Sequence, residues 1–151
     1  MMILCVGPPG SGKSTWCHMY KSKYPACEIV SSDQVRGDLK LGEYDPNKDV
    51  MVHSVTRSRA LEALKRKHDV IVDSTNCKIE EILAYRNVCP LGVIFAGKVF
   101  DITPEECYRR ISKRERKVPL YRIREKYDNL QETKRVLNQI FNFVFQIEKS
   151  W

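Results

Sequence analysis

The fold is decided by the stretch Gly7-Pro8-Pro9-Gly10-Ser11-Gly12-Lys13-Ser14, which satisfies the phosphate-loop pattern GxxxxGK[ST]. The stretch follows a β-rich run at Met2–Val6 and precedes a helical pattern over Lys13–Lys21, which is the context that the pattern requires. Glycine lets such a loop curl until its backbone N–H groups point at phosphate oxygens, and the N-terminal end of the helix adds positive potential. The sequence therefore predicts that this segment binds a nucleoside triphosphate.

Two side chains of the loop have predicted roles in holding the triphosphate. Lys13 supplies a cation for the β- and γ-phosphates, and the Ser14 hydroxyl ligates Mg²⁺. We therefore expect ATP, or another nucleoside triphosphate, together with Mg²⁺. The residues expected to contact them are Gly7, Pro8, Pro9, Gly10, Ser11, Gly12, Lys13, Ser14 and Thr15.

The loop alone does not fix the reaction, because ATP-driven motors, GTP switches and kinases all share it. A GTPase would need a guanine-reading NKxD after a strand, whereas the nearest string, Asn47-Lys48-Asp49, has the wrong spacing and opens a helix. An AAA-type motor would need more chain than these 151 residues leave. The size therefore favours a small phosphotransferase.

Short apolar runs alternate with longer helical patterns along the chain, which is typical of βαβ units with a parallel sheet. Further strands are expected at Glu28–Val30, Asp69–Asp73 and Gly92–Phe100. We expect a single α/β domain over residues 1–151, with a kinase-type parallel sheet of four to five strands flanked by helices, and a basic helical lid at about 107–119.

A helix is expected from Asp45-Pro46 to about Lys67, because an acidic N-cap followed by proline is a helix start signal. Val50, Leu61 and Leu64 would share a face that polar residues interrupt. Either this face borders a site, or the helix packs only at its two ends.

A last helix is expected over about 128–149, because its apolar residues form two adjacent stripes. We expect this surface to dock on the sheet; the alternative is that it serves a second copy of the chain in a homo-oligomer. The stripes are Leu137, Phe141 and Val144, and Val136, Ile140, Phe143 and Ile147.

The composition, 42% hydrophobic and 30% charged, is that of a globular chain. The longest apolar stretches are far shorter than a membrane span, and the N-terminus carries no basic leader, so we expect a cytoplasmic protein that does not cross a membrane. The six cysteines form no CxxC pair and have no histidine cluster nearby, which favours reduced, mostly buried thiols over a zinc site or disulfides.

Phosphate transfer also needs a group that deprotonates the acceptor hydroxyl and a cation that holds the acceptor. Asp33 and Arg36 follow the second expected strand and would share a face of a helical turn. They are our candidates for a general base and for an acceptor-binding cation. From spacing alone, Asp33 acting as a helix N-cap beside a solvated Arg36 remains open.

A second polar cluster, Asp73-Ser74-Thr75-Asn76, closes the buried third strand at the same edge of the expected sheet. A carboxylate in this position is the usual Walker B form, which acts on the metal directly or through water. We therefore propose Ser14 and Asp73 as the metal-associated pair, although such a cluster could instead only close a turn.

The positive charge of the chain is concentrated in one segment. Residues 107–126 hold nine Lys or Arg and two Glu, and the rest of the chain holds 17 basic and 17 acidic residues, so this segment carries the whole net charge of +7. Thr103-Pro104 predicts the start of a helix that would place Arg110 and Arg114 one turn apart. These arginines fit a lid over the triphosphate; a solvated basic face is the alternative.

The chain resembles the 5′-kinase domain of phage-type polynucleotide kinases, and the likeness extends to about Tyr127. Five segments carry the resemblance, and their order and spacing are more specific than any one of them. They are GPPGSGKSTW at Gly7–Trp16, SSDQVR at Ser31–Arg36, VIVDSTN at Val70–Asn76, KVFD at Lys98–Asp101 and RRISKRERKVP at Arg109–Pro119.

The resemblance implies transfer of the ATP γ-phosphate to the 5′-hydroxyl end of DNA or RNA. It places Asp33 as the general base, Arg36 on the acceptor phosphate, and Arg110 and Arg114 on the donor triphosphate. From the phosphate-loop pattern, Lys13 is also expected to take part in catalysis. Thr75 and Asn76 match the polar turn of the family and are expected to contact substrate; Asp73 and Ser74 are exchanged relative to the phage pattern.

Two other functions stay open at this point. One is a nucleoside or other small-molecule kinase with the same fold, and the other is a nucleotide-dependent binding protein that transfers nothing. Aromatic residues that would stack on a terminal base of a nucleic acid include Tyr44, Tyr85 and Tyr121.

Overall fold

A computed structural model describes residues 1–42 and 45–149. The elements expected near the N-terminus are confirmed to within a few residues at their ends. In chain order they are β1 Met2–Val6, α1 Lys13–Lys23, β2 Glu28–Ser31, α2 Ser32–Asp38, α3 Pro46–Lys65, β3 Val70–Asp73, α4 Ile79–Val88, β4 Phe95–Asp101, α5 Pro104–Ser112, α6 Leu120–Thr133, the 3₁₀ turn η1 Lys134–Val136, α7 Leu137–Ile140, β5 Phe143–Val144 and β6 Glu148–Lys149.

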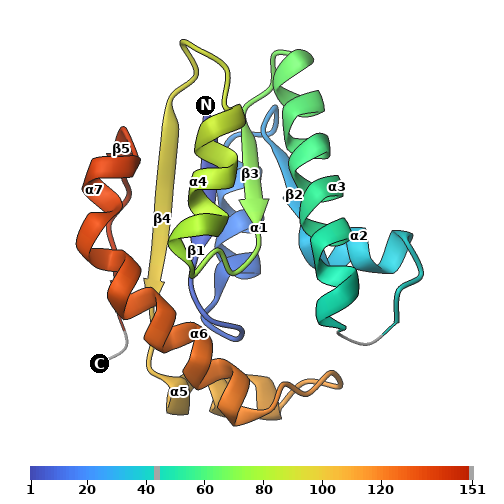
Figure 1. The fold of residues 1–151 in the computed structure, drawn as a ribbon, viewed down its shortest axis with the longest axis vertical. Helices are drawn as coiled ribbons and strands as arrows, with labels where there is room; N and C mark the ends of the chain where they lie inside the picture. The colour runs from blue at the N-terminus through green and yellow to red at the C-terminus, as the bar shows by residue number, and fades with distance from the viewer. Residues whose placement is uncertain (43–44, 150–151) are drawn as a thin grey trace.

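The strands form one parallel sheet in the order β2-β3-β1-β4-β5, with β6 also paired to β4 (Figure 1). The register places Leu4 opposite Val72 on one side and Gly97 on the other. The expected parallel α/β sheet flanked by helices is therefore confirmed, with two short additional strands at the β4 edge.

The core divides between the two faces of the sheet, because side chains of a strand alternate sides. Met2, Leu4 and Val6 pack with residues of α3, α4, α6 and α7. Ile3 and Cys5 pack on the opposite face with residues of α1, α5 and the start of α6. All of β1 is buried, so both helical layers fix the strand that leads into the phosphate loop.

The carboxyl ends of β1, β2 and β3 lie at one edge of the sheet, where ligands of open α/β folds bind. The loop after β3 is tied to the loop after β1, since the Gly7 N–H donates to the Thr75 carbonyl at 2.9 Å. This edge therefore brings together the phosphate loop, the start of α2 and the polar turn after β3.

The prediction of one helix over about 128–149 is wrong. The real helix, α6, begins earlier and ends at Thr133; after η1 and α7, Phe143–Val144 forms a strand beside β4. The exposed edge of β4 explains the change, because its backbone groups need partners that a helix cannot supply. Asn142 satisfies two of them: its N–H donates to the Phe95 carbonyl at 2.8 Å, and its Oδ1 accepts from Phe95 N–H at 3.0 Å.

The apolar residues of that segment still pack against the sheet, as Leu137 and Phe141 are 3% and 4% exposed. The homo-oligomer prediction relied on a C-terminal helix that the described residues do not form. Phe143, expected in an apolar stripe, is 54% exposed.

Helix α3 starts as expected, with the Asp45 side chain accepting from the Asn47 N–H at 2.9 Å. Its buried face is Val52, Thr56, Ala60 and Ala63, so the expected stripe through Val50 is wrong, since Val50 is 75% exposed.

The cysteines are mostly buried, as expected. All six cysteines are free, and five of them are buried. No helix among the described residues is long and apolar enough to cross a membrane.

Candidate active site

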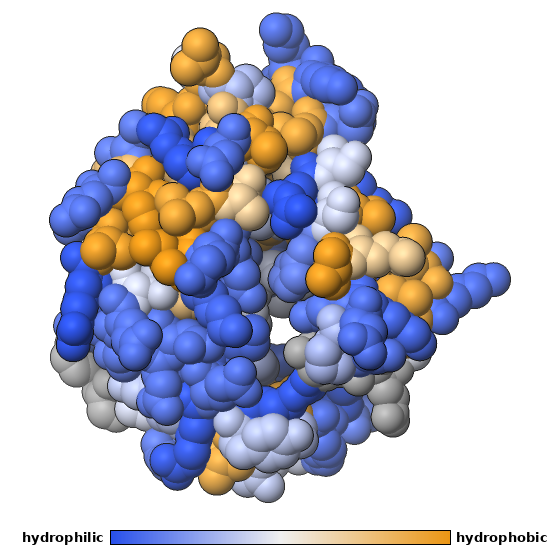
Figure 2. Space-filling model, in the orientation of Figure 1, coloured by the Kyte–Doolittle hydropathy of each residue, from blue (hydrophilic) through white to orange (hydrophobic). Residues whose placement is uncertain are grey.

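A cavity of about 370 Å³ opens at the carboxyl edge of the sheet. Its walls come from the phosphate loop, α2, α3, the β3–α4 turn, the segment after α5, and α6. Figure 2 shows a hollow surrounded mainly by hydrophilic side chains, between the side of the molecule that carries α2 and α3 and the side that carries α4 and α6. Segments far apart in the sequence thus share one polar pocket.

The phosphate loop has the backbone that its glycines predict. Gly10 has φ +80°, and a Cβ there would lie 2.6 Å from the Cys107 carbonyl oxygen of α5. Gly12, the N-cap of α1, has φ +96°. These positive φ values favour glycine and shape the turn that leads into α1.

Two polar groups of the loop fit a phosphate ligand. The Lys13 ammonium donates to the Pro8 carbonyl at 2.7 Å, so it is held across the loop. The Ser11 hydroxyl is buried and has no hydrogen-bond partner among the described residues. Phosphate oxygens would accept from both groups, which is the chemistry that a triphosphate offers.

Ser14 and Asp73 meet as the sequence suggested. The Ser14 hydroxyl donates to Asp73 Oδ2 at 2.6 Å, and both residues line the cavity. A hydroxyl and a carboxylate are ligands that Mg²⁺ prefers. No group of three or more His, Cys, Asp or Glu in the described chain forms a metal cluster, so a magnesium ion here would take phosphate oxygens and water as its other ligands.

Helix α2 carries Asp33 and Arg36 into the same cavity. The N-cap is Ser31, whose side chain accepts from the Gln34 N–H at 3.4 Å; Asp33 is therefore not the cap. Its carboxylate is 76% exposed and lies 3.3 Å from the Arg116 guanidinium. The candidate base is thus accessible from the pocket and contacts the segment that follows α5.

Arg36 belongs to a network that sequence reasoning missed. It is 8% exposed and forms an ion pair with Asp49 of α3, which also lies 3.5 Å from the His53 ring. Burial would raise the pKa of Asp49, but hydrogen bonds from His53 and Arg36 outweigh it and lower that pKa. The one available signal was the i, i+4 spacing of Asp49 and His53 on a helix that faces the sheet edge.

The turn after β3 separates two predicted residues. Thr75 lines the cavity, whereas the side chain of Asn76 is fully buried and its amide donates to the Cys5 carbonyl at 3.0 Å. Asn76 has φ 45°, a left-handed conformation that asparagine tolerates. Asn76 therefore joins the turn to β1, while Thr75 and Ser74 face the pocket.

The two lid arginines are not one helical turn apart. Helix α5 starts at Pro104 with the expected Thr103 cap, but it ends at Ser112. Arg114 lies beyond it and lines the cavity, whereas Arg110 pairs with Glu106 at 2.9 Å and has a guanidinium nitrogen 3.6 Å from the Cβ position of Gly12. The helical part of the expected lid covers only its first half, and the rest is irregular up to Pro119.

Neither of the two aromatic candidates among the described residues lies at the site. Tyr85 is 1% exposed in the core, and Tyr121 is 69% exposed outside the cavity. Tyr44 lies outside the described residues. The cavity wall also includes Lys78 and Glu81, which sequence reasoning did not single out, and Arg122 and Lys126, which it counted only as part of the basic segment 107–126.

The sheet and the loop define a P-loop kinase fold. The structure of deoxyadenosine kinase from M. mycoides with bound dATP matches with a TM-score of 0.60 over 97% of this chain and 91% of that one, at 20% identity. The chain belongs to the AAA domain family, whose profile matches residues 2–137. Sequence analysis excluded an AAA-type motor on chain length alone. The match to this family concerns the domain that contains the phosphate loop.

Two other similar proteins bear on the site. The structure of the Pnkp1/Rnl/Hen1 RNA repair complex matches with a TM-score of 0.78 and 25% identity, over 89% of this chain and 45% of that one. The adenylate kinase of Thermococcus sibiricus is 32% identical over 76% of this chain and 56% of its own length. The chain thus spans little more than half the length of this curated relative.

Proposed function

We propose that this chain transfers the γ-phosphate of ATP to the 5′-hydroxyl end of a nucleic acid, with Asp33 as the general base. The observation that carries the proposal is that Asp33 and Arg36 open into the same cavity as Lys13, Ser14 and Asp73. A base and an acceptor-binding cation thus share one pocket with a phosphate loop, as phosphate transfer requires.

The transfer step follows from these positions. The Asp33 carboxylate accepts the proton of the acceptor hydroxyl as that oxygen bonds to the γ-phosphorus. The bond from the γ-phosphorus to the bridging oxygen breaks, and ADP leaves with that electron pair. Lys13, Arg110 and Arg114 would neutralise charge on the transferred group.

Ser14 and Asp73 would hold the magnesium ion, Asp73 either directly or through water. When bound, Mg²⁺ supplies positive charge to the β- and γ-phosphate oxygens. The 2.6 Å hydrogen bond between the two side chains already places both oxygens beside the loop.

A nucleic acid end as acceptor is supported by the likeness to the Pnkp1/Rnl/Hen1 RNA repair complex and by the segments shared with polynucleotide kinases. Arg36 would contact the phosphate nearest the accepting hydroxyl. Among polynucleotide kinases, the sequence segments most resemble those of the phage-type enzymes.

A second candidate is a mononucleotide or nucleoside kinase. The observation in its favour is the identity of about a third with an adenylate kinase over 76% of this chain. Such an enzyme would take an acceptor without any phosphodiester.

One assay separates these functions. Labelled ATP is offered with a 5′-hydroxyl oligonucleotide, a nucleoside 3′-monophosphate, a bare nucleoside, AMP and water. We expect label on the oligonucleotide and, more weakly, on the 3′-monophosphate. Label on AMP or the nucleoside alone would establish the second candidate, and release of phosphate to water without any transfer would indicate a nucleotide-dependent binding protein.

A further inference from the structure

The cavity holds more cations than the transfer of one phosphate uses. Lys13 serves the donor, Arg36 the acceptor end, and Arg114 and Arg116 come from the segment after α5. Three further basic residues, Lys78, Arg122 and Lys126, line the wall formed by the start of α4 and by α6. These three have no part in the proposed chemical step.

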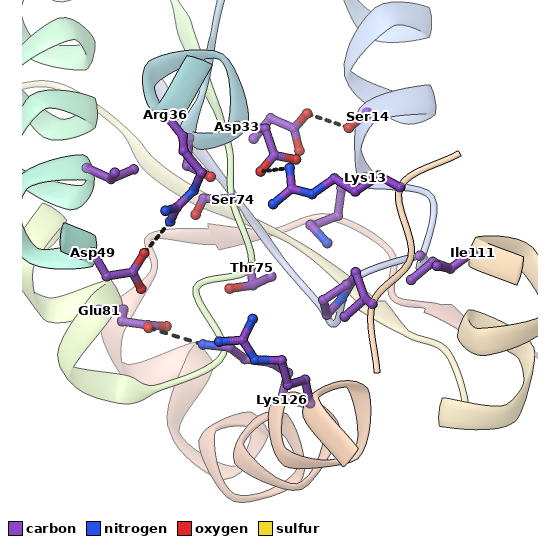
Figure 3. A pocket seen from close by; sticks show the side chains of 18 of the residues that line it. Lys13, Ser14, Asp33, Arg36, Asp49, Ser74, Thr75, Glu81, Ile111 and Lys126 are labelled. Carbon is purple, nitrogen blue, oxygen red and sulfur yellow. Dashed lines mark hydrogen bonds and ion pairs between the residues drawn. The ribbon is translucent and has the colours of Figure 1, made fainter. Parts of the chain in front are cut away.

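The three cations converge from two separate elements. Arg122 and Lys126 are four residues apart in α6, so they lie on one face of that helix, and Lys78 is the N-cap residue of α4. In the view of Figure 3, Lys126 lies at the lower edge of the pocket with its ammonium toward Glu81, and Arg36 lies above, beside Asp49. The second set of cations therefore shares one cavity with Arg36, at the proposed acceptor position.

The Glu81 carboxylate contacts two residues of this set. Glu81 Oε2 accepts from the Lys78 backbone N–H at 3.1 Å, while Glu81 Oε1 lies 3.7 Å from the Lys126 ammonium. The Lys126 and Glu81 side chains are 27% and 18% exposed. The longer ion pair is loose by the standards of charge-assisted hydrogen bonds, so an incoming phosphate would compete for Lys126.

We propose that Lys78, Arg122 and Lys126 form a second anion-binding subsite, which binds the next phosphodiester of a single-stranded acceptor. The proposal rests on the proposed function and extends it: the acceptor is a chain of at least two phosphates rather than a mononucleotide. Arg36 takes the phosphate nearest the 5′-hydroxyl, and the α4–α6 wall takes the following one.

Helix α6 offers a matched control. Arg124 lies between the two subsite residues in sequence but pairs with Glu105 at 2.8 Å on the exposed side, where the two side chains are 54% and 65% exposed. Arg124 does not line the cavity. Arg124→Ala removes the same charge as a subsite substitution without touching the pocket.

The test measures binding without ATP, at several salt concentrations. The probes are 5′-hydroxyl tetranucleotides of DNA and RNA labelled at the 3′ end, and a nucleoside 3′-monophosphate. For Lys126→Ala and Lys78→Ala we expect about tenfold weaker binding of the tetranucleotides and a salt slope smaller by roughly 0.7. Binding of the monophosphate, the KM for ATP and every value for Arg124→Ala should stay unchanged.

Glu81→Gln tests the same subsite in the opposite direction. Glutamine keeps an acceptor for the α4 cap but removes the competing charge, so tetranucleotide binding should tighten. Equal losses for tetranucleotide and monophosphate, no loss for either, or a raised KM for ATP would overturn the subsite.

The proposed function is judged separately, by transfer. If wild type labels oligonucleotides and the variants bind them as wild type does, the subsite is wrong and the function stands. If wild type labels none, yet its binding depends on Lys126 as described, the subsite stands and the function is wrong.

Discussion

The Ser14 hydroxyl donates a hydrogen bond to Asp73 Oδ2 at 2.6 Å, across a sequence separation of 59 residues. This contact joins the phosphate loop after β1 to the end of β3, which are neighbouring strands of the sheet. It places the only two oxygen ligands that we propose for magnesium within one hydrogen bond of each other. The proposed metal site is therefore built by strand order.

Replacing Asp73 with asparagine should lower kcat by about 10²-fold or more, because a carboxylate near the metal contributes several kcal/mol of charge stabilisation. The measurement is kcat as a function of magnesium concentration. Asp101→Asn is the control: Asp101 also ends a strand, but Lys134 and Gln131 hold it at 2.6 and 2.9 Å outside the cavity. A magnesium dependence equal to wild type in Asp73→Asn would remove its metal role.

Replacing Asp33 with alanine should leave folding and ATP binding intact and reduce transfer by about 10²–10⁴-fold, the usual contribution of general-base catalysis. Single-turnover transfer to a 5′-hydroxyl oligonucleotide measures it. Asp38→Ala is matched, since Asp38 is on the same helix but pairs with Arg59 at 2.7 Å on the surface. Transfer near the wild-type rate in Asp33→Ala would mean that another group takes the proton.

Arg36→Ala should raise the acceptor KM more than the ATP KM, because we propose that this guanidinium contacts the phosphate of the acceptor. Asp49→Asn should shift the acceptor KM in the same direction but less, since it loosens the ion pair that orients Arg36. Steady-state kinetics with each substrate varied would measure both. An unchanged acceptor KM in Arg36→Ala would contradict its role, and Arg59→Ala serves as the surface control.

The Arg36–Asp49 pair should also give a pH-dependent stability. Because the folded-state pKa of Asp49 is lowered from 3.8, its contribution is present above that value and disappears as the pH falls through the lower folded value. Asp49→Asn should cost about 1–2 kcal/mol at pH 7, and the cost should shrink near pH 3. Urea unfolding at both pH values measures it; a larger difference at pH 3 would contradict the sign.

Arg110→Ala should lower kcat by roughly 10³-fold if Arg110 neutralises the transferred phosphate. Arg109→Ala is the control on the same helix, because Arg109 pairs with the same carboxylate, Glu106, at 2.6 Å but faces solvent. The pKa of Glu106 is lowered to about 2 by hydrogen bonds from Arg109 and Arg110, so it stays ionised throughout the assay range. Equal losses in the two variants would show that only the charge of the segment matters.

Gly97→Ala tests the corrected C-terminal packing. A Cβ at Gly97 would lie 2.6 Å from the Phe141 ring, so we expect a loss of about 1–3 kcal/mol from overpacking. Gly37, inside α2, has nothing within 4 Å of its Cβ position, and Gly37→Ala should stabilise by about 0.4–1 kcal/mol. Urea unfolding measures both, and a neutral Gly97→Ala would mean that Phe141 does not seat against β4.

Local signals predicted much of the fold. The loop with its flanking strand and helix, the Asp45 and Thr103 caps, and three further strands depend on neighbouring residues, and each was found where expected. The C-terminal segment failed because its apolar spacing suits a helix, whereas the open edge of β4 supplies backbone partners only to an extended chain. That edge is made by residues more than forty positions away.

The sequence by itself determined the phosphate loop and the parallel α/β class, and it suggested Ser14 and Asp73 as a metal-associated pair. The tertiary structure alone decided that Asp49 holds Arg36, that Arg114 lies beyond its helix, and that Lys78 and Lys126 face the same cavity. The physical reason is the distance along the chain over which each interaction acts. Propensities and caps act over a few residues, whereas a pocket wall is assembled from side chains whose proximity depends on how helices pack across the sheet.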